Sequence, residues 1–289
     1  MDIRIKRDKK KQKQIHIYLR AAIQIFFFIV SPSAFTAAFA GVKYLFTQIG
    51  MGEKIGMTSF VAALLVLCLY TVVFGRFFCG FACAFGSLGD ALHGIYVWIC
   101  KKGKKKPWKP DDKWTSWMRW IKYLVLTIIV LMCFAGVYGR TKGTSPWEVF
   151  SMLRAGNWKL TGYLAGVLIL LLLMAGMCVQ ERFFCRFFCP MGAVFSLLPV
   201  LPFFTLARNR ENCVKGCSGC TKKCPASLEL SSLDSMETSG ECFQCQKCMD
   251  ICPKGNVRVR ISKIRGNEVW FTLARALLLA ALLFGFGLA

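Results

Sequence analysis

Residues 213–225 read CVKGCSGCTKKCP, and residues 242–253 read CFQCQKCMDICP. Each stretch contains four cysteines, and in each the fourth cysteine is followed by proline. The second stretch has the spacing C-x2-C-x2-C-x3-C-P, and the first has one more residue between its first two cysteines. Eight thiols grouped in fours within about forty residues predict a small module that binds metal through cysteine.

The spacing favours iron–sulfur clusters over zinc or disulfides. In runs of this kind three neighbouring cysteines bind one [4Fe–4S] cluster and the fourth binds the other. The expected ligand sets are Cys213, Cys217, Cys220 and Cys252 for the first cluster, and Cys242, Cys245, Cys248 and Cys224 for the second. Zinc sites typically use two separated pairs, often with histidine, and this chain has two histidines. A reducing cytoplasmic location, argued below, disfavours disulfides.

The remainder of the chain has the composition of an integral membrane protein. Of its 289 residues, 55% are apolar, and the mean hydropathy is +0.48. The apolar runs predict about five transmembrane helices, and an amphipathic interfacial helix is expected over residues 87–100. The five predicted spans are residues 15–46 with a kink at Pro32, 57–74, 121–138, 160–179 and 269–288.

The net charge of +23 suggests nucleic acid or a membrane surface as the partner. Thirty-one lysines and arginines lie in the segments expected to be cytoplasmic, and six lie in the two outer loops. This asymmetry follows the positive-inside rule. It predicts a multi-pass protein of the cytoplasmic membrane with its N-terminus and cysteine module inside, in contact with membrane lipid and not with nucleic acid.

A second cysteine pattern occurs twice in the membrane part. Residues 75–86 read GRFFCGFACAFG and residues 181–192 read ERFFCRFFCPMG, so both contain R-F-F-C-x3-C-x2-G. If the halves are related by pseudo-symmetry, the four cysteines would face each other and hold a further iron–sulfur cluster, with Arg76 and Arg182 offsetting its charge. Packed or redox-active thiols are the alternative. These cysteines are Cys79, Cys83, Cys185 and Cys189.

These patterns predict an all-α membrane bundle of two span-pair repeats with a cytoplasmic α+β module like a two-cluster bacterial ferredoxin. The expected parts are residues 1–100 and 101–207 for the two membrane halves, 208–265 for the module and 266–289 for the last helix.

Two membrane C-x3-C motifs followed by a pair of ferredoxin runs resemble the NapH/NosR type of membrane-bound polyferredoxin. The resemblance covers nearly the whole chain. It implies electron exchange with quinone or quinol, or with partner redox subunits. It leaves open whether the chain acts as a quinol dehydrogenase. Two features depart from the family pattern: Ala84 follows the first motif where Pro190 follows the second, and a fifth span follows the module.

The sequence lacks the binding motifs of other common redox cofactors. No C-x-x-C-H or G-x-G-x-x-G motif occurs, and no covalently bound flavin is evident. His16 and His93 are expected too near the membrane surface to ligate haem within it. The prediction is therefore an iron–sulfur subunit that moves single electrons and has no catalytic residue of its own. A redox-sensing or cofactor-maturation protein is the alternative, and a membrane-tethered zinc protein is a remote one.

The sequence also suggests positions and roles for several charged residues. Asp90 and Glu181 are the acidic groups closest to the motifs, either as solvated interfacial charges or as groups that handle quinol protons. Arg275 is expected to snorkel from the last span to the surface. Four lysines of the module are expected to attract a soluble ferredoxin or flavodoxin, or to face anionic lipid. These lysines are Lys222, Lys223, Lys247 and Lys254.

Overall fold

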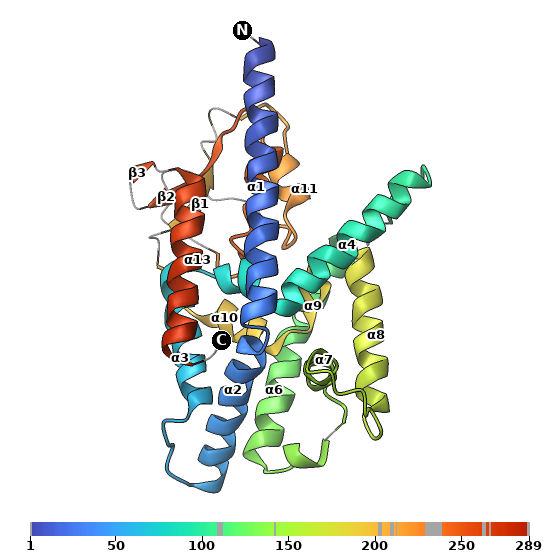
Figure 1. The fold of residues 1–289 in the computed structure, drawn as a ribbon, viewed down its shortest axis with the longest axis vertical. Helices are drawn as coiled ribbons and strands as arrows, with labels where there is room; N and C mark the ends of the chain where they lie inside the picture. Colours follow the sequence, from blue (N-terminus) through green and yellow to red (C-terminus); the bar gives the residue numbers. More distant parts are fainter. Residues whose placement is uncertain are drawn as a thin grey trace.

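The computed structural model describes most of the chain, which is mostly helical. The described residues are 2–108, 112–141, 143–201, 204–208, 211, 213–228, 239–261, 264–265 and 267–287. Figure 1 shows three layers along the long axis: the strands and α11 lie at one end beside α1, helices α2, α3, α6, α7 and α8 lie at the other, and α9 and α10 lie between them.

The first apolar run forms two helices, α1 (Asp2–Val30) and α2 (Ala34–Met51). The break falls at Ser31-Pro32-Ser33, because proline lacks an amide donor and its ring clashes with the preceding turn. The single kinked span expected over residues 15–46 is thus a pair of helices. Helix α2 packs against α3 (Ser59–Phe74) and α6 (Ile121–Phe134).

Within the described part of the chain, three segments are long and apolar enough to cross a membrane. They are Lys11–Val30, Trp114–Phe134 and Glu268–Gly285, and the last is helix α13. Helices α3 and α8 (Leu164–Val179) are apolar but have 16 residues each. At 1.5 Å per residue, 16 residues cover about 24 Å of a hydrocarbon core about 30 Å thick. The expected end of the last span, Leu288, lies outside the described residues.

The helix expected over residues 87–100 is present as α4 (Ala84–Lys102). It packs on α8 and α1, and its far end projects from the body of the molecule (Figure 1). The shorter helical elements are η1 (Phe78–Ala82), α5 (Asp112–Met118), η2 (Tyr138–Thr141), α7 (Pro146–Arg154), α9 (Phe183–Phe187), α10 (Pro190–Leu197), α11 (Gly219–Lys223) and α12 (Lys247–Ile251).

Three antiparallel strands form a small sheet in the order β1-β2-β3. They are β1 (Phe204–Arg208), β2 (Val257–Ile261) and β3 (Ile264–Arg265). Leu206 pairs with Val259, and both pack in a small core with Cys220 and Cys248. The sheet therefore includes residues before position 208, where the module was expected to begin, and joins the chain ahead of the cysteine runs to the chain behind them.

Candidate functional site

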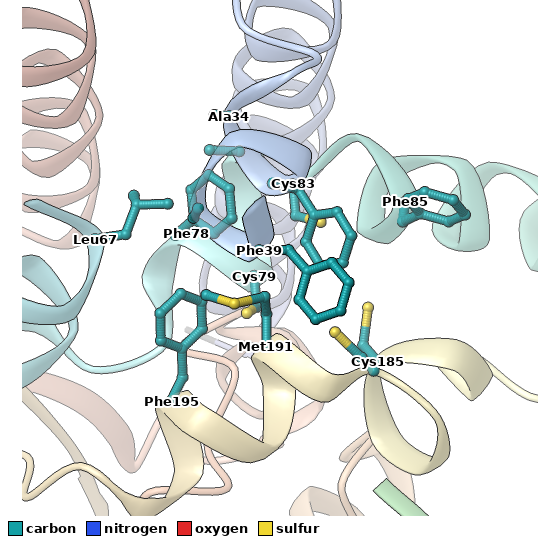
Figure 2. Close-up of a cluster of buried hydrophobic side chains, with 14 of the residues drawn as sticks. Ala34, Phe39, Leu67, Phe78, Cys79, Cys83, Phe85, Cys185, Met191 and Phe195 are labelled. Carbon is teal, nitrogen blue, oxygen red and sulfur yellow. The ribbon is translucent and has the colours of Figure 1, made fainter. Parts of the chain in front are cut away.

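The four membrane-motif cysteines are all buried in the main hydrophobic core. Cys79 lies in η1, and Cys185 lies in α9. Cys83 caps the N-terminus of α4, and Cys189 caps that of α10, where its Sγ accepts a hydrogen bond of 3.1 Å from the Gly192 amide. Figure 2 shows the sulfur atoms of Cys79, Cys83 and Cys185 among buried aromatic rings.

The two cysteine pairs interact electrostatically across the two motifs. Burial raises the pKa of the Cys189 thiol well above its ordinary value, and the thiolates of the three other motif cysteines add to that rise. Each of the other three therefore lies close enough to Cys189 to interact electrostatically. The fold brings the motifs together although 106 residues separate Cys79 from Cys185.

Each expected cysteine group has the four thiol ligands that a [4Fe–4S] cluster takes. Among the residues the structure describes, no three His, Cys, Asp or Glu side chains are close enough to hold one metal ion. A zinc ion draws its thiolates to about 2.3 Å from one centre, whereas a [4Fe–4S] cluster is bound through a different iron atom by each thiolate and so holds its ligands further apart. All sixteen cysteines lie in the described part of the chain, and none forms a disulfide.

The two motif arginines cross over to the opposite motif. The guanidinium of Arg182 donates to the carbonyl oxygens of Cys79 and Gly80, the latter at 2.7 Å. Arg76 donates to the carbonyl oxygen of Cys185 at 3.4 Å. Sequence patterns predicted positive charge near the cysteines. The reciprocal crossing, which joins the two halves through their cysteine turns, was not predicted.

The last glycine of each motif makes room for the arginine of the other. A Cβ on Gly86 would lie 2.6 Å from Nη1 of Arg182, and a Cβ on Gly192 would lie 2.9 Å from Nη2 of Arg76. A methyl group at either position would therefore displace a buried guanidinium. The occurrence of glycine at the same place in both copies was the available signal for this packing.

Asp90 is the carboxylate partner of Arg182. It accepts hydrogen bonds from Arg182 at 3.0 and 2.5 Å, from Gln24 at 2.7 Å and from Lys247 at 3.3 Å. Burial alone would raise the pKa of Asp90, but Arg182 and Lys247 together hold it well below its usual range. Lys247 also pairs with Glu181. The interpretation of Asp90 and Glu181 as solvated interfacial charges is wrong, because both are buried in an ion-pair network.

Two lysines are placed differently from the sequence-based expectation. Lys247 was expected to be exposed, but its ammonium is buried between Asp90 and Glu181. Lys122 is one of the thirty-one lysines and arginines counted in the expected cytoplasmic segments, but its side chain is 0% exposed, and its Nζ lies 2.5 and 2.6 Å from the two carboxylate oxygens of Glu241. Glu241 also accepts from Arg76 at 3.2 Å and from the Tyr123 hydroxyl at 3.0 Å.

The cysteines expected to form the second set interact with one another electrostatically, and Cys248 also interacts with Cys220 of the first set. Burial and, to a smaller extent, the nearby Cys224 thiolate raise the pKa of the Cys242 thiol to about 11. Cys248 interacts in the same way with Cys245, Cys242 and Cys224. The last cysteine of the first run therefore lies with the three leading cysteines of the second.

The first cysteine set lines one pocket at the surface of the module. The pocket contains all four expected ligands, Cys213, Cys217, Cys220 and Cys252. Three nitrogen donors point at these sulfurs: Nη1 of Arg208 is 3.3 Å from Cys220 Sγ, and the Asn256 amide and Nδ2 are 3.2 and 3.5 Å from Cys252 and Cys213. Such donors stabilise anionic sulfur and tune a bound cluster.

Arg275 and the two histidines each contact a defined partner. Arg275 is 1% exposed and lies 4.6 Å above the Phe77 ring, so the expectation that it snorkels to the surface is wrong. His16 lies 2.9 Å from Asp250, and His93 lies 2.9 Å from the carbonyl oxygen of Cys178.

Comparisons with known proteins match the two membrane motifs and align with most of the chain. A family model described as a 4Fe-4S binding domain matches residues 56–107 and 163–202, which contain the two membrane motifs. An uncharacterized protein of Methanocaldococcus jannaschii is 29% identical over 82% of this chain and 84% of its own. The putative electron transport protein YccM of Escherichia coli is 25% identical over 74% of this chain and 60% of its own.

The ferredoxin-type protein NapH of Escherichia coli is 24% identical over 71% of this chain and 69% of its own. No solved structure matches. The 4Fe-4S domain match and these relatives make the chain similar to the NapH-type polyferredoxins and support a place in that family.

Proposed function

We propose that this protein is an electron-transfer subunit of the cytoplasmic membrane. In this proposal single electrons pass between two [4Fe–4S] clusters in the cysteine module, a further iron–sulfur site at the membrane motifs, and quinone or an extracytoplasmic redox partner. One observation carries it: the twelve motif cysteines lie near cationic side chains, with Arg76 and Arg182 at the membrane motifs, Arg208 at the first set, and Arg20 and Arg182 acting electrostatically on Cys245 of the second.

The residues of each group fit an anionic cluster. Cys213, Cys217, Cys220 and Cys252 would hold the first module cluster, Cys242, Cys245, Cys248 and Cys224 the second, and Cys79, Cys83, Cys185 and Cys189 the membrane cluster. Such clusters supply one-electron transfer when bound. The chain itself contributes the thiolates, a low dielectric and nearby guanidinium groups, which together set the reduction potential.

The proposed topology has five membrane helices with the cysteine module on the cytoplasmic side. Besides the three segments long enough to cross, the apolar helices α3 and α8 would complete the count. Their shortness is compatible with a locally thinned bilayer. The lysine and arginine asymmetry supports the orientation.

An apolar pocket beside the second membrane motif supports quinone as a partner. It lies between α6, α7, α8 and α9, and its wall contains Phe184, which directly precedes Cys185. Most of its lining is aliphatic or aromatic, and Tyr138, Thr144, Ser145 and Trp147 are its residues with polar groups. Clefts of this kind, mostly apolar with a few polar groups, suit a hydrophobic cofactor with a polar head.

The exposed edge of the module supports an acidic soluble donor. Cys217 is exposed, and Lys222, Lys223 and Lys254 lie near the first cysteine set in the sequence and stay at the surface. A ferredoxin or flavodoxin with an acidic face would be steered to these lysines. The family relatives named as electron-transport or ferredoxin-type proteins agree with such a role.

Turnover tests this proposal against a redox-sensing or maturation role. The full-length protein, purified without oxygen in lipid nanodiscs, is reduced with a quinol analogue and reoxidised with a soluble one-electron acceptor. We expect repeated oxidation of quinol, with iron and inorganic sulfide present. A single reduction that then stops would favour the sensing or maturation role. Zinc without iron or sulfide would establish the zinc alternative and overturn the proposal.

A further inference from the structure

We propose that residues 241–247, the second-run loop, form the contact through which electrons cross between the module and the membrane motifs, and that the first cysteine set is the outer end of the path. This inference rests on the proposed function, because it assigns an order to the three sites. It makes the second set the direct partner of the membrane site. The first set then exchanges electrons with that site only through the second.

Phe243 anchors the second-run loop between the two membrane motifs. Its side chain is 2% exposed, and its ring lies 4.6 Å from the guanidinium carbon of Arg76 and 5.8 Å from that of Arg182. Its carbonyl oxygen lies so close to Gly80 that no Cβ would fit there. Gly80 directly follows Cys79. The chain that carries Cys242 and Cys245 therefore touches the turn that carries Cys79.

Buried ion pairs fix both ends of the loop. At its start Glu241 binds Lys122 and Arg76, and at its end Lys247 binds Asp90. Removing one partner of a buried ion pair leaves the other charge uncompensated, so such pairs resist separation. The loop is thereby held in one position relative to both motifs.

A further contact joins the second set to the other motif. Nη1 of Arg186, the residue after Cys185, donates to the carbonyl oxygen of Pro225 at 3.2 Å. Pro225 follows Cys224, the cysteine that lies with the second set. Both membrane motifs thus contact chain directly adjacent to second-set cysteines. The first set instead lines a pocket at the module surface, where Cys217 is exposed.

The transfer across this contact is a one-electron step that needs no proton and no bond change. With clusters bound, the second-set cysteines would hold the group that loses one electron and the membrane-motif cysteines the group that gains it, or the reverse for the opposite direction. The external donor is a soluble one-electron carrier that meets the first set. The arginines between the sites carry fixed positive charge and so lower the cost of placing negative charge on either side.

The test is Gly80→Ala, with Gly94→Ala in α4 as the matched control, because nothing lies within 4 Å of a Cβ at Gly94. Both variants are made in the full-length protein and assayed for iron, for hydrogen exchange of residues 239–248 and for magnetic interaction between clusters by EPR. Gly80→Ala should speed hydrogen exchange of the second-run loop and weaken the magnetic interaction. It should also slow electron transfer between module and membrane site more than about tenfold, since small displacements of reacting centres are costly in rate. Gly94→Ala should match the parent protein.

Phe243→Leu provides a second test of the same contact if Gly80→Ala fails to assemble. It removes the ring between the arginines but adds no atom beside the backbone of Gly80. Hydrogen exchange of the loop should therefore rise, and the magnetic interaction and the electron-transfer rate should fall, each by a smaller factor than in Gly80→Ala. A looser loop with unchanged magnetic interaction and rate would overturn the inference. So would a magnetic interaction of the membrane site with the first set in place of the second. Parent protein without iron would instead overturn the proposed function itself.

Discussion

The two copies of R-F-F-C-x3-C-x2-G make matching contacts with each other, although the first forms a π-helical turn and the second an α-helical turn, and their arginines have different carboxylate partners. In both, the arginine reaches the cysteine turn of the other copy and lies on its final glycine. Arg182 is neutralised by Asp90, which belongs to α4 and follows the first motif directly in the chain. Arg76 is neutralised by Glu241, which belongs to the cysteine module.

This difference separates two structural roles that the repeat alone would hide. The Arg182–Asp90 pair joins the two membrane halves and is nearly sealed from solvent, since the side chains are 1% and 11% exposed. The Arg76–Glu241 pair joins the module to the membrane part, and Glu241 is 26% exposed. Arg182 therefore joins the two membrane halves through Asp90, which also binds Lys247 of the module, whereas Arg76 binds the module directly through Glu241.

Arg182→Gln should have the largest effect. It leaves the buried Asp90 carboxylate with Lys247 as its remaining cationic partner, and breaking a buried pair in this way costs about 3–5 kcal/mol. Thermal unfolding in detergent measures the loss. Arg76→Gln is the matched variant and should cost less, because Glu241 keeps Lys122 and Tyr123. An equal or larger loss for Arg76→Gln would contradict the distinction between the two pairs.

Glu241→Gln should have the second largest effect. It should lower the stability of the module and leave that of the membrane helices unchanged. Hydrogen bonds to charged groups contribute about 1.5–3 kcal/mol each, and this change weakens those from Lys122 and Arg76. We expect faster trypsin cleavage within residues 239–261 while the membrane helices keep their unfolding temperature. Asp90→Asn is the comparison and should lower that unfolding temperature. If Glu241→Gln destabilised the membrane helices as much, the two pairs would have one role.

Gly86→Ala and Gly192→Ala should each cost about 1–3 kcal/mol through overpacking. Gly86→Ala should cost more, because its Cβ would be 2.6 Å from Arg182 while that of Gly192→Ala would be 2.9 Å from Arg76. Unfolding in detergent, with Gly94→Ala as the control, measures both. Neutral behaviour of both variants would show that the crossed arginines adjust without cost.

Arg208→Gln should give the smallest effect, confined to the first cysteine set. It removes the guanidinium that donates to Cys220 Sγ at 3.3 Å. The reduced, more negative state of a cluster there would lose stabilisation, so its potential should fall by up to about 60 mV, equivalent to a tenfold shift for one electron. EPR-monitored redox titration measures it. A fall in the potential of the second or membrane site would contradict the separation of the sets.

The sequence contained the groups but not the contacts between them. Cysteine spacing predicted that Cys224 lies with Cys242 and Cys248, because in paired ferredoxin runs the fourth cysteine of one run joins the three leading cysteines of the other. Hydropathy predicted the apolar helices, because each helix lies within one continuous run of apolar residues. The burial of Lys122 and Lys247 was missed, because their partners Glu241 and Asp90 are 119 and 157 residues away. Only the assembled fold brings such charges together.

The repeat was informative beyond what was inferred from it. Glycine at the same position of both copies signalled close packing, and arginine at the same position signalled positive charge beside both cysteine pairs. Which atoms these residues meet depends on how the halves face each other, and a linear pattern does not specify that. Arg275 illustrates the same limit, because its place over Phe77 follows from the packing of α13 against α3 and η1.

Iron and inorganic sulfide per chain, measured on protein purified without oxygen, test the central claim most directly. Four iron atoms per cluster and three groups of four cysteines predict about twelve iron atoms and a matching amount of sulfide. In Cys79→Ala/Cys185→Ala the count should fall to about eight, because the module keeps its two clusters. A parent protein with about eight iron atoms that the double variant leaves unchanged would contradict a cluster at the membrane motifs.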